Sequence, residues 1–122
     1  MNVTGKNISS SIETAKSCAN NTETVINQLT INESGIYLLL AQASFVKNGT
    51  GFRMLRIRNN ALSMSYGGFN YTQNTSSSVE LQVVSISSPS VNKGNVVKLV
   101  ARQNSGASLN ISHSYITAVR IK

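Results

Sequence analysis

The sequence lacks most of the residues on which catalytic and metal sites depend. Its 122 residues include no aspartate, four glutamates, one histidine and one cysteine. A Ser-His-Asp triad has no acid here, and a pair formed by Cys18 and His113 has no third group to orient it. Zinc and calcium sites need several nitrogen, sulfur or carboxylate ligands close together, and the chain is poor in all of them. The composition therefore predicts no enzyme activity, no metal and no cofactor.

The single cysteine also excludes a disulfide within the chain. The fold must then be stable through its core or through oligomerisation, and a small buried thiol is the favoured interpretation of Cys18. No apolar run approaches the length of a membrane-spanning helix, and residues 1–6 do not form a signal peptide. We therefore expect no membrane insertion.

Charged residues make up only 12% of the chain, and the net charge is nevertheless +7. Asn, Ser and Thr together supply about a third of the residues, a polar composition common in secreted, cell-surface and virion proteins. Lysine and arginine are spread along the chain, with one cluster at Arg53, Arg56 and Arg58. Nucleic-acid binders concentrate such residues and interleave aromatics, so we expect no nucleic-acid partner. A solvated basic face is the simplest interpretation, and attraction to polyanionic surfaces is the alternative.

The strongest pattern along the chain is the segment Gly35–Phe45. Its alternate residues Tyr37, Leu39 and Phe45 are apolar, and so are Leu38 and Leu40 on the other parity. A helix would suit the leucines, but the preceding glycine and the following Asn-Gly-Thr-Gly turn favour a strand. A strand that is apolar on both faces needs a second partner, which is another layer or another subunit.

Several further segments alternate between apolar and polar residues and predict half-buried strands. In the segment 52–60, Leu55 and Ile57 share one parity, and Arg56 and Arg58 share the other. The last predicted strand, Ser114 to Ile121, is the second without a fully polar face, and His113 is expected to be a polar residue at its start. The other predicted strands are 79–83, which Pro89 ends, 96–102, and shorter ones before residue 32 and between 61 and 71.

Short strands separated by Gly, Asn and Ser turns predict an all-β fold, a jelly-roll β-sandwich of about 8–10 antiparallel strands. The length fits one domain, so residues 1–122 are interpreted as a single C-terminal head domain. Residues 1–12 are interpreted as its stalk-proximal end or as a segment exchanged between chains.

The sequence from about Cys18 to Ile121 resembles the TNF/complement C1q-like family of jelly-roll domains. Gly35-Ile36-Tyr37 matches the family's Gly-x-Tyr at the start of an inner strand. Lys93-Gly94-Asn95 matches its Lys-Gly-Asp turn imperfectly, Val97-Lys98-Leu99 matches the next strand, and the aromatic-led strand from Tyr115 matches the last. Asn95 replaces the family's Asp, Ser85 to Val91 resembles an insertion, and the family's closing Phe-Gly pair is missing.

The resemblance implies a tight homotrimer at the end of a fibrous stalk. The two strands that lack a polar face are the ones that the family places at the trimer axis. The resemblance and the pattern together therefore give Leu38, Leu40 and Tyr115 as trimer-interface residues. The expected core residues are Tyr37, Phe45 and Leu99.

The expected ligand-binding residues combine aromatic and basic side chains. Tyr66, Phe69 and Tyr71 lie in or beside the bend at Gly67-Gly68, with Arg56 and Arg58 on the preceding strand. Such residues suit sugars and anionic polymers, whereas packing within a hairpin is the alternative for the three aromatics.

The expected function is that of a receptor-binding head of a bacteriophage tail fibre or baseplate protein. Such a head would recognise a bacterial surface saccharide or an anionic wall polymer, and it would be located on the virion at the tail tip or on another extracellular surface. The alternative is the structural head of a collagen-like spore- or cell-surface filament, which would drive trimerisation and bind no specific ligand.

Overall fold

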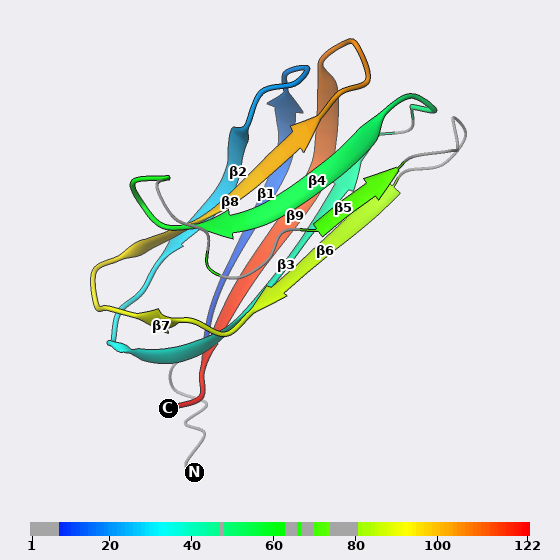
Figure 1. Ribbon diagram of the computed structural model, residues 1–122. Helices are drawn as coiled ribbons and strands as arrows, with labels where there is room; N and C mark the ends of the chain where they lie inside the picture. Colours follow the sequence, from blue (N-terminus) through cyan, green and yellow to red (C-terminus); the bar gives the residue numbers. More distant parts are fainter. Residues whose placement is uncertain (1–7, 47, 63–65, 67–69, 74–80) are drawn as a thin grey trace.

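The computed structural model describes residues 8–46, 48–62, 66, 70–73 and 81–122. Within these residues the backbone forms nine strands and no helix, arranged in two layers (Figure 1). The strands are β1 (Ile8–Cys18), β2 (Thr24–Thr30), β3 (Gly35–Phe45), β4 (Phe52–Arg58), β5 (Asn70–Gln73), β6 (Leu81–Ser87), β7 (Ser90–Val91), β8 (Val96–Gln103) and β9 (Leu109–Arg120). The predicted all-β sandwich is confirmed.

The two layers have complementary strand orders. Sheet A has the order β1-β9-β3-β6, and the short β7 pairs with the beginning of β3. Sheet B has the order β2-β8-β4-β5. Every pairing between these strands is antiparallel. The first and last strands are neighbours in sheet A, and β2 and β8 are neighbours in sheet B, which is the connectivity of a jelly-roll.

The alternation of apolar residues explains which side of each strand is buried. On β4, Leu55 and Ile57 point into the space between the sheets, and on β8, Val97 and Leu99 do the same. Branched and aromatic side chains on such alternate positions pack well on a pleated surface, and their burial stabilises the sandwich. The core combines residues of both sheets: Cys18, Ile26, Leu29, Ile31, Tyr37, Leu39, Ala41, Ala43, Phe45, Leu55, Ile57, Tyr66, Val91, Val97, Leu99, Ala101, Ile111, Ile116 and Ala118.

The three expected core residues all lie in this cluster. Phe45 and Leu99 are fully buried, and so is the Tyr37 ring. The Tyr37 hydroxyl donates a hydrogen bond to the backbone oxygen of Glu33, at 2.6 Å, and this bond satisfies its polar end. Cys18 is also fully buried, and its thiol lies 3.7 Å from the backbone oxygen of Ala101 in sheet B.

The last strand is longer than the sequence predicted. It begins at Leu109 rather than Ser114, so His113 lies within the strand and not at its start. Leu109 and Ile111 are buried, but the polar residues around them made this segment look like a loop. The strand is irregular here, because the register with β3 shifts between Ser44 and Phe45. Such a shift changes which face the alternate residues occupy.

The first strand is also longer than the sequence predicted, because polar residues surround its isoleucines. β1 pairs along β9 of the same chain from Ile8 to Cys18, with Ile8 opposite Val119. The first strand therefore starts beside the end of the last strand, and the described chain enters and leaves the sandwich at one end (Figure 1). The predicted turn at 92–95 is present at this end, where Gly94 has a φ of +88° that favours glycine.

Candidate functional site

Two outward surfaces of the sandwich differ in their chemistry. The first, called the uncharged face, lies on the outside of sheet A. The register places its side chains in rows across the four strands: Ile12 lies opposite Tyr115, and Tyr115 opposite Gln42. The next row joins Thr117, Leu40 and Ile86. The uncharged face consists of Ile12, Leu38, Leu40, Gln42, Ile86, Tyr115, Thr117 and Val119.

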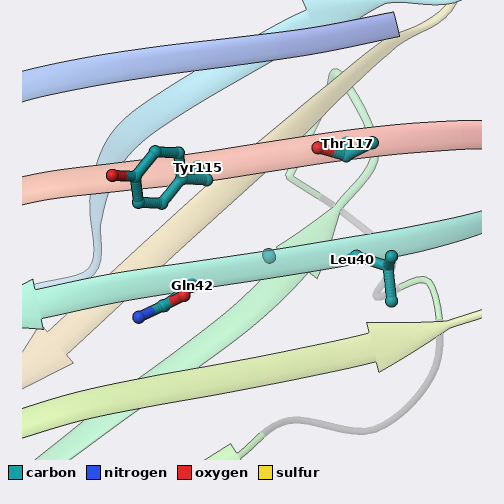
Figure 2. A pocket seen from close by; sticks show the side chains of 5 residues that line it. Leu40, Gln42, Tyr115 and Thr117 are labelled. Atoms are coloured by element: carbon teal, nitrogen blue, oxygen red, sulfur yellow. The ribbon is translucent and has the colours of Figure 1, made fainter. Parts of the chain in front are cut away.

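Large apolar side chains on the uncharged face are open to solvent in the single chain. Ile12 is 64% exposed, Ile86 62%, Tyr115 39% and Leu40 37%. Between β3 and β9 the face forms a shallow depression of about 220 Å³, with Leu40 beside Thr117 and Gln42 beside Tyr115 (Figure 2). A contiguous apolar surface of this kind usually marks an interface in a soluble protein.

His113 lies at the border of the uncharged face, one row beyond Tyr115. Its Nε2 is 3.0 Å from the hydroxyl oxygen of Ser44 on the neighbouring strand. The imidazole and the Tyr115 ring meet edge to face, with their centroids 5.3 Å apart. The Tyr115 ring therefore packs against an imidazole that is itself held by Ser44.

The structure brings the three expected interface residues together. Leu38, Leu40 and Tyr115 all belong to the uncharged face, because β3 and β9 are neighbours in sheet A. Sequence reasoning missed Ile12 and Ile86, which lie on the two outer strands of this face. Each is a single isoleucine among polar residues, and only the register shows that it continues the same surface.

The second surface, called the cationic face, lies on the outside of sheet B, at the opposite side of the sandwich. Because Val97, Leu99 and Ala101 point inward, their neighbours Lys98 and Arg102 point outward from β8. The outward residues of β4 lie beside them, with Arg58 opposite Lys98 and Arg56 opposite Val100. The cationic face consists of Arg56, Arg58, Lys98 and Arg102, together with Glu23.

Glu23 precedes β2 and pairs with two arginines at once. Its Oε2 is 2.6 Å from Nη1 of Arg58, and its Oε1 is 3.3 Å from Nε of Arg56. The Arg56 side chain is 22% exposed, the Arg58 side chain 16% and the Glu23 side chain 31%. The alternation of this strand predicted solvent or a ligand as the neighbour of Arg56 and Arg58. That expectation is corrected, because Glu23 lies beside both.

Arg53 does not belong to the cationic face, although the sequence groups it with the other two arginines. It points inward from β4 and is fully buried. Its guanidinium donates hydrogen bonds to the backbone oxygens of Asn48, Thr50 and Phe52, at 2.8 to 3.0 Å, and lies 5.9 Å from the centre of the Phe45 ring. Burial lowers the pKa of this guanidinium, although nearby Cys18 opposes the change. Arg53 is a structural residue that satisfies loop carbonyls.

The expected aromatic ligand-binding residues are not supported as a group. Tyr66 is only 7% exposed and belongs to the core, and its backbone nitrogen donates to the oxygen of Ile57 at 2.8 Å. It packs inside the sandwich because the chain turns back over the end of β4, so its assignment to a ligand site is corrected. Phe69 and the side chain of Tyr71 lie outside the described residues.

The described residues contain no group of three or more His, Cys, Asp or Glu that could hold a metal ion. They also contain no helix long and apolar enough to cross a membrane.

Comparison with known proteins gives matches in structure alone. No protein-family model and no curated protein sequence matches the chain. The globular domain of zebrafish complement 1qA protein has a TM-score of 0.64 at 17% identity, and the match covers 95% of this chain and 98% of that one. The vertex protein P5 of PRD1 has a TM-score of 0.66 at 19% identity over 100% of both chains. Eiger TNF from S. frugiperda has a TM-score of 0.55 at 10% identity, covering 98% of this chain and 88% of that one.

The fold is a TNF/C1q-like jelly-roll. Gly35 begins β3, as the resemblance implied, whereas Tyr115 lies within β9 and does not lead it. Within the TNF/C1q-like sandwich, sheet A carries the uncharged face and sheet B carries the cationic face.

Proposed function

We propose that this chain is the trimeric receptor-binding head of a phage tail fibre or baseplate protein, and that it recognises a saccharide or wall polymer on a bacterial surface. The observation that carries the proposal is the separation of the two faces. One side of the sandwich offers apolar groups to solvent, and the opposite side gathers cations. The head has no catalytic role in this proposal.

The uncharged face supports self-association. A second copy that covers the exposed isoleucine, leucine and tyrosine side chains lowers the free energy, because burial of apolar surface is favourable. Assembly through sheet A leaves the cationic face of every copy free, because sheet B lies on the other side. Three copies would then present three identical binding surfaces, which raises avidity even when each site is weak.

The comparisons support a surface location and a non-catalytic role. The vertex protein P5 of PRD1 resembles the chain over the whole length of both proteins, which favours a virion component. The described chain enters and leaves at one end of the sandwich, a geometry that suits attachment to a stalk.

The first experiment measures the molar mass of the purified domain by light scattering. We expect three times 13.1 kDa at micromolar concentration. A monomer under these conditions would contradict the assembly part of the proposal.

The second experiment measures adhesion of the fluorescently labelled head to a panel of Gram-positive and Gram-negative cells and to a glycan array. We expect saturable adhesion to at least one host surface. A trimer that adheres to none of these surfaces would favour the alternative function, in which the head only drives assembly of a filament.

A further inference from the structure

We propose that the cationic face binds a phosphodiester polyanion of the bacterial wall, and that the Glu23 carboxylate occupies a phosphate position when no polymer is bound. This inference rests on the proposed function and specifies its ligand chemistry. It concerns Arg56 and Arg58, which contact the Glu23 carboxylate, and Lys98 and Arg102 on the neighbouring strand.

The arrangement of charges on the cationic face opposes folding. Arg58 and Lys98 lie directly opposite each other on neighbouring antiparallel strands, and like charges in such a pair are destabilising. Arg56 is two residues from Arg58 on the same side of β4, which adds a third cation nearby. Only one carboxylate lies among these cations in the described part of the chain. Residues that lower the folding stability of a sheet surface are expected where they serve binding.

Glu23 shows what kind of group this surface accepts. Its two oxygens contact two different arginines, at 2.6 and 3.3 Å, as two oxygens of one phosphate would. Guanidinium groups bind carboxylates and phosphates through the same planar arrangement of N–H donors. The carboxylate comes from the connection between β1 and β2, so it can leave without disturbing the strand pairs of sheet B.

The surface suits a charged polymer better than a neutral sugar. Neutral saccharides favour open aromatic rings, and the described aromatic ring on the outside of β4 is Phe52, with the Arg102 guanidinium 5.9 Å above it. Single-stranded nucleic acid needs the same kind of open rings for stacking. The cations instead lie on two adjacent strands, whose backbones are about 5 Å apart, and such a row suits a repeating anion.

The test uses immobilised poly(glycerol phosphate) as the probe, with binding measured by surface plasmon resonance at low and high salt. Glu23→Gln should bind about fivefold more tightly, because it frees two guanidinium groups. Glu33→Gln is the matched control, since it makes the same charge change at an exposed residue beyond the other end of β2. The control should stay within about twofold of the unmodified protein.

Loss of cations provides the opposite test. The double variant Arg56→Ser, Arg58→Ser should bind about tenfold more weakly and lose much of the salt dependence. Lys98→Thr should also bind more weakly, yet it should melt at a higher temperature, because it removes the unfavourable pair with Arg58. A purely structural role for these residues predicts no change in binding for Glu23→Gln, for the double variant or for Lys98→Thr.

The outcomes separate this inference from the function on which it rests. Binding to poly(glycerol phosphate) that Glu23→Gln strengthens and Glu33→Gln does not would support the inference. Cell adhesion without binding to this polymer would overturn the inference and leave the receptor-binding function standing. Equal or tighter binding to neutral dextran or to duplex DNA would also overturn it, and absence of cell adhesion would overturn both.

Discussion

The two outer faces of the sandwich both lie on antiparallel strands, but their side chains differ in charge and polarity. The uncharged face exposes Ile12, Leu40, Ile86 and Tyr115, and it contains no lysine, arginine or glutamate. The cationic face combines four cations with one carboxylate, which contacts two of them. Covering an apolar surface lowers the free energy. A surface rich in one charge is most stable in water or against the opposite charge. The proposed function uses this difference, because it assigns the uncharged face to contacts between copies and the cationic face to an anionic partner.

The largest expected effect comes from placing a charge on the uncharged face. Leu40→Glu should convert the trimer to monomers, because a buried unpaired charge in an interface costs several kcal/mol per subunit. Leu40 is 37% exposed in the single chain, so the monomer itself should still fold. Light scattering and circular dichroism measure the two properties.

The matched control for this variant is Thr30→Glu, at an exposed outward position of β2 in sheet B. It introduces the same charge on the other side of the sandwich and should remain a trimer. Dissociation of both variants would show that net charge, and not the position of the uncharged face, determines assembly.

A smaller effect distinguishes the arginines of β4. Arg53→Ser should lower the free energy of unfolding by about 2–4 kcal/mol, because it removes a fully buried side chain and its hydrogen bonds to backbone oxygens of the neighbouring loop. Arg56→Ser, on the outside of the same strand, should change it by less than about 1 kcal/mol, because an ion pair at the surface that is partly open to solvent contributes little. Urea denaturation at a fixed protein concentration measures both values. Equal losses would mean that the strand's two sides do not differ as described.

The all-β fold and the two strands without a fully polar face could be predicted from the sequence, because both depend on local alternation. Gly35–Phe45 is apolar on both parities, and a period of two residues translates directly into two faces. The jelly-roll resemblance then supplied the neighbours of each strand. Tyr37, Leu38 and Leu40 were therefore placed on the correct sides of β3.

The candidate sites depend on contacts between residues that are far apart in the sequence, and no local pattern predicts such contacts. Glu23 and Arg58 are 35 residues apart, and their contact depends on how the β1–β2 connection crosses the end of sheet B. Arg53 and Arg56 look alike in sequence, yet odd and even positions of one strand put them in different environments. Tyr66 could not be assigned to the core because its position depends on the path of the chain after β4.

The smallest expected effect concerns Cys18, which is buried in the core between the two faces. Burial raises the pKa of the Cys18 thiol, although Thr24 and Arg53 oppose the change. The folded state therefore holds the thiol proton more tightly than the unfolded chain does. Stability from this group is complete below about pH 8.5, the ordinary pKa of cysteine, and is lost as the pH rises through the higher folded value.

Between pH 7 and pH 9.5 the free energy of unfolding should fall more for the protein than for Cys18→Ala, measured by urea denaturation at one protein concentration. A thiol reagent at pH 8 should react with Cys18 only after unfolding, because the side chain is fully buried between the sheets. Poly(glycerol phosphate) binding should be the same in Cys18→Ala and the unmodified protein at pH 7, since this residue belongs to neither face. Rapid labelling of the folded protein would mean that sheets A and B separate readily, and the two faces could then not be treated as independent surfaces.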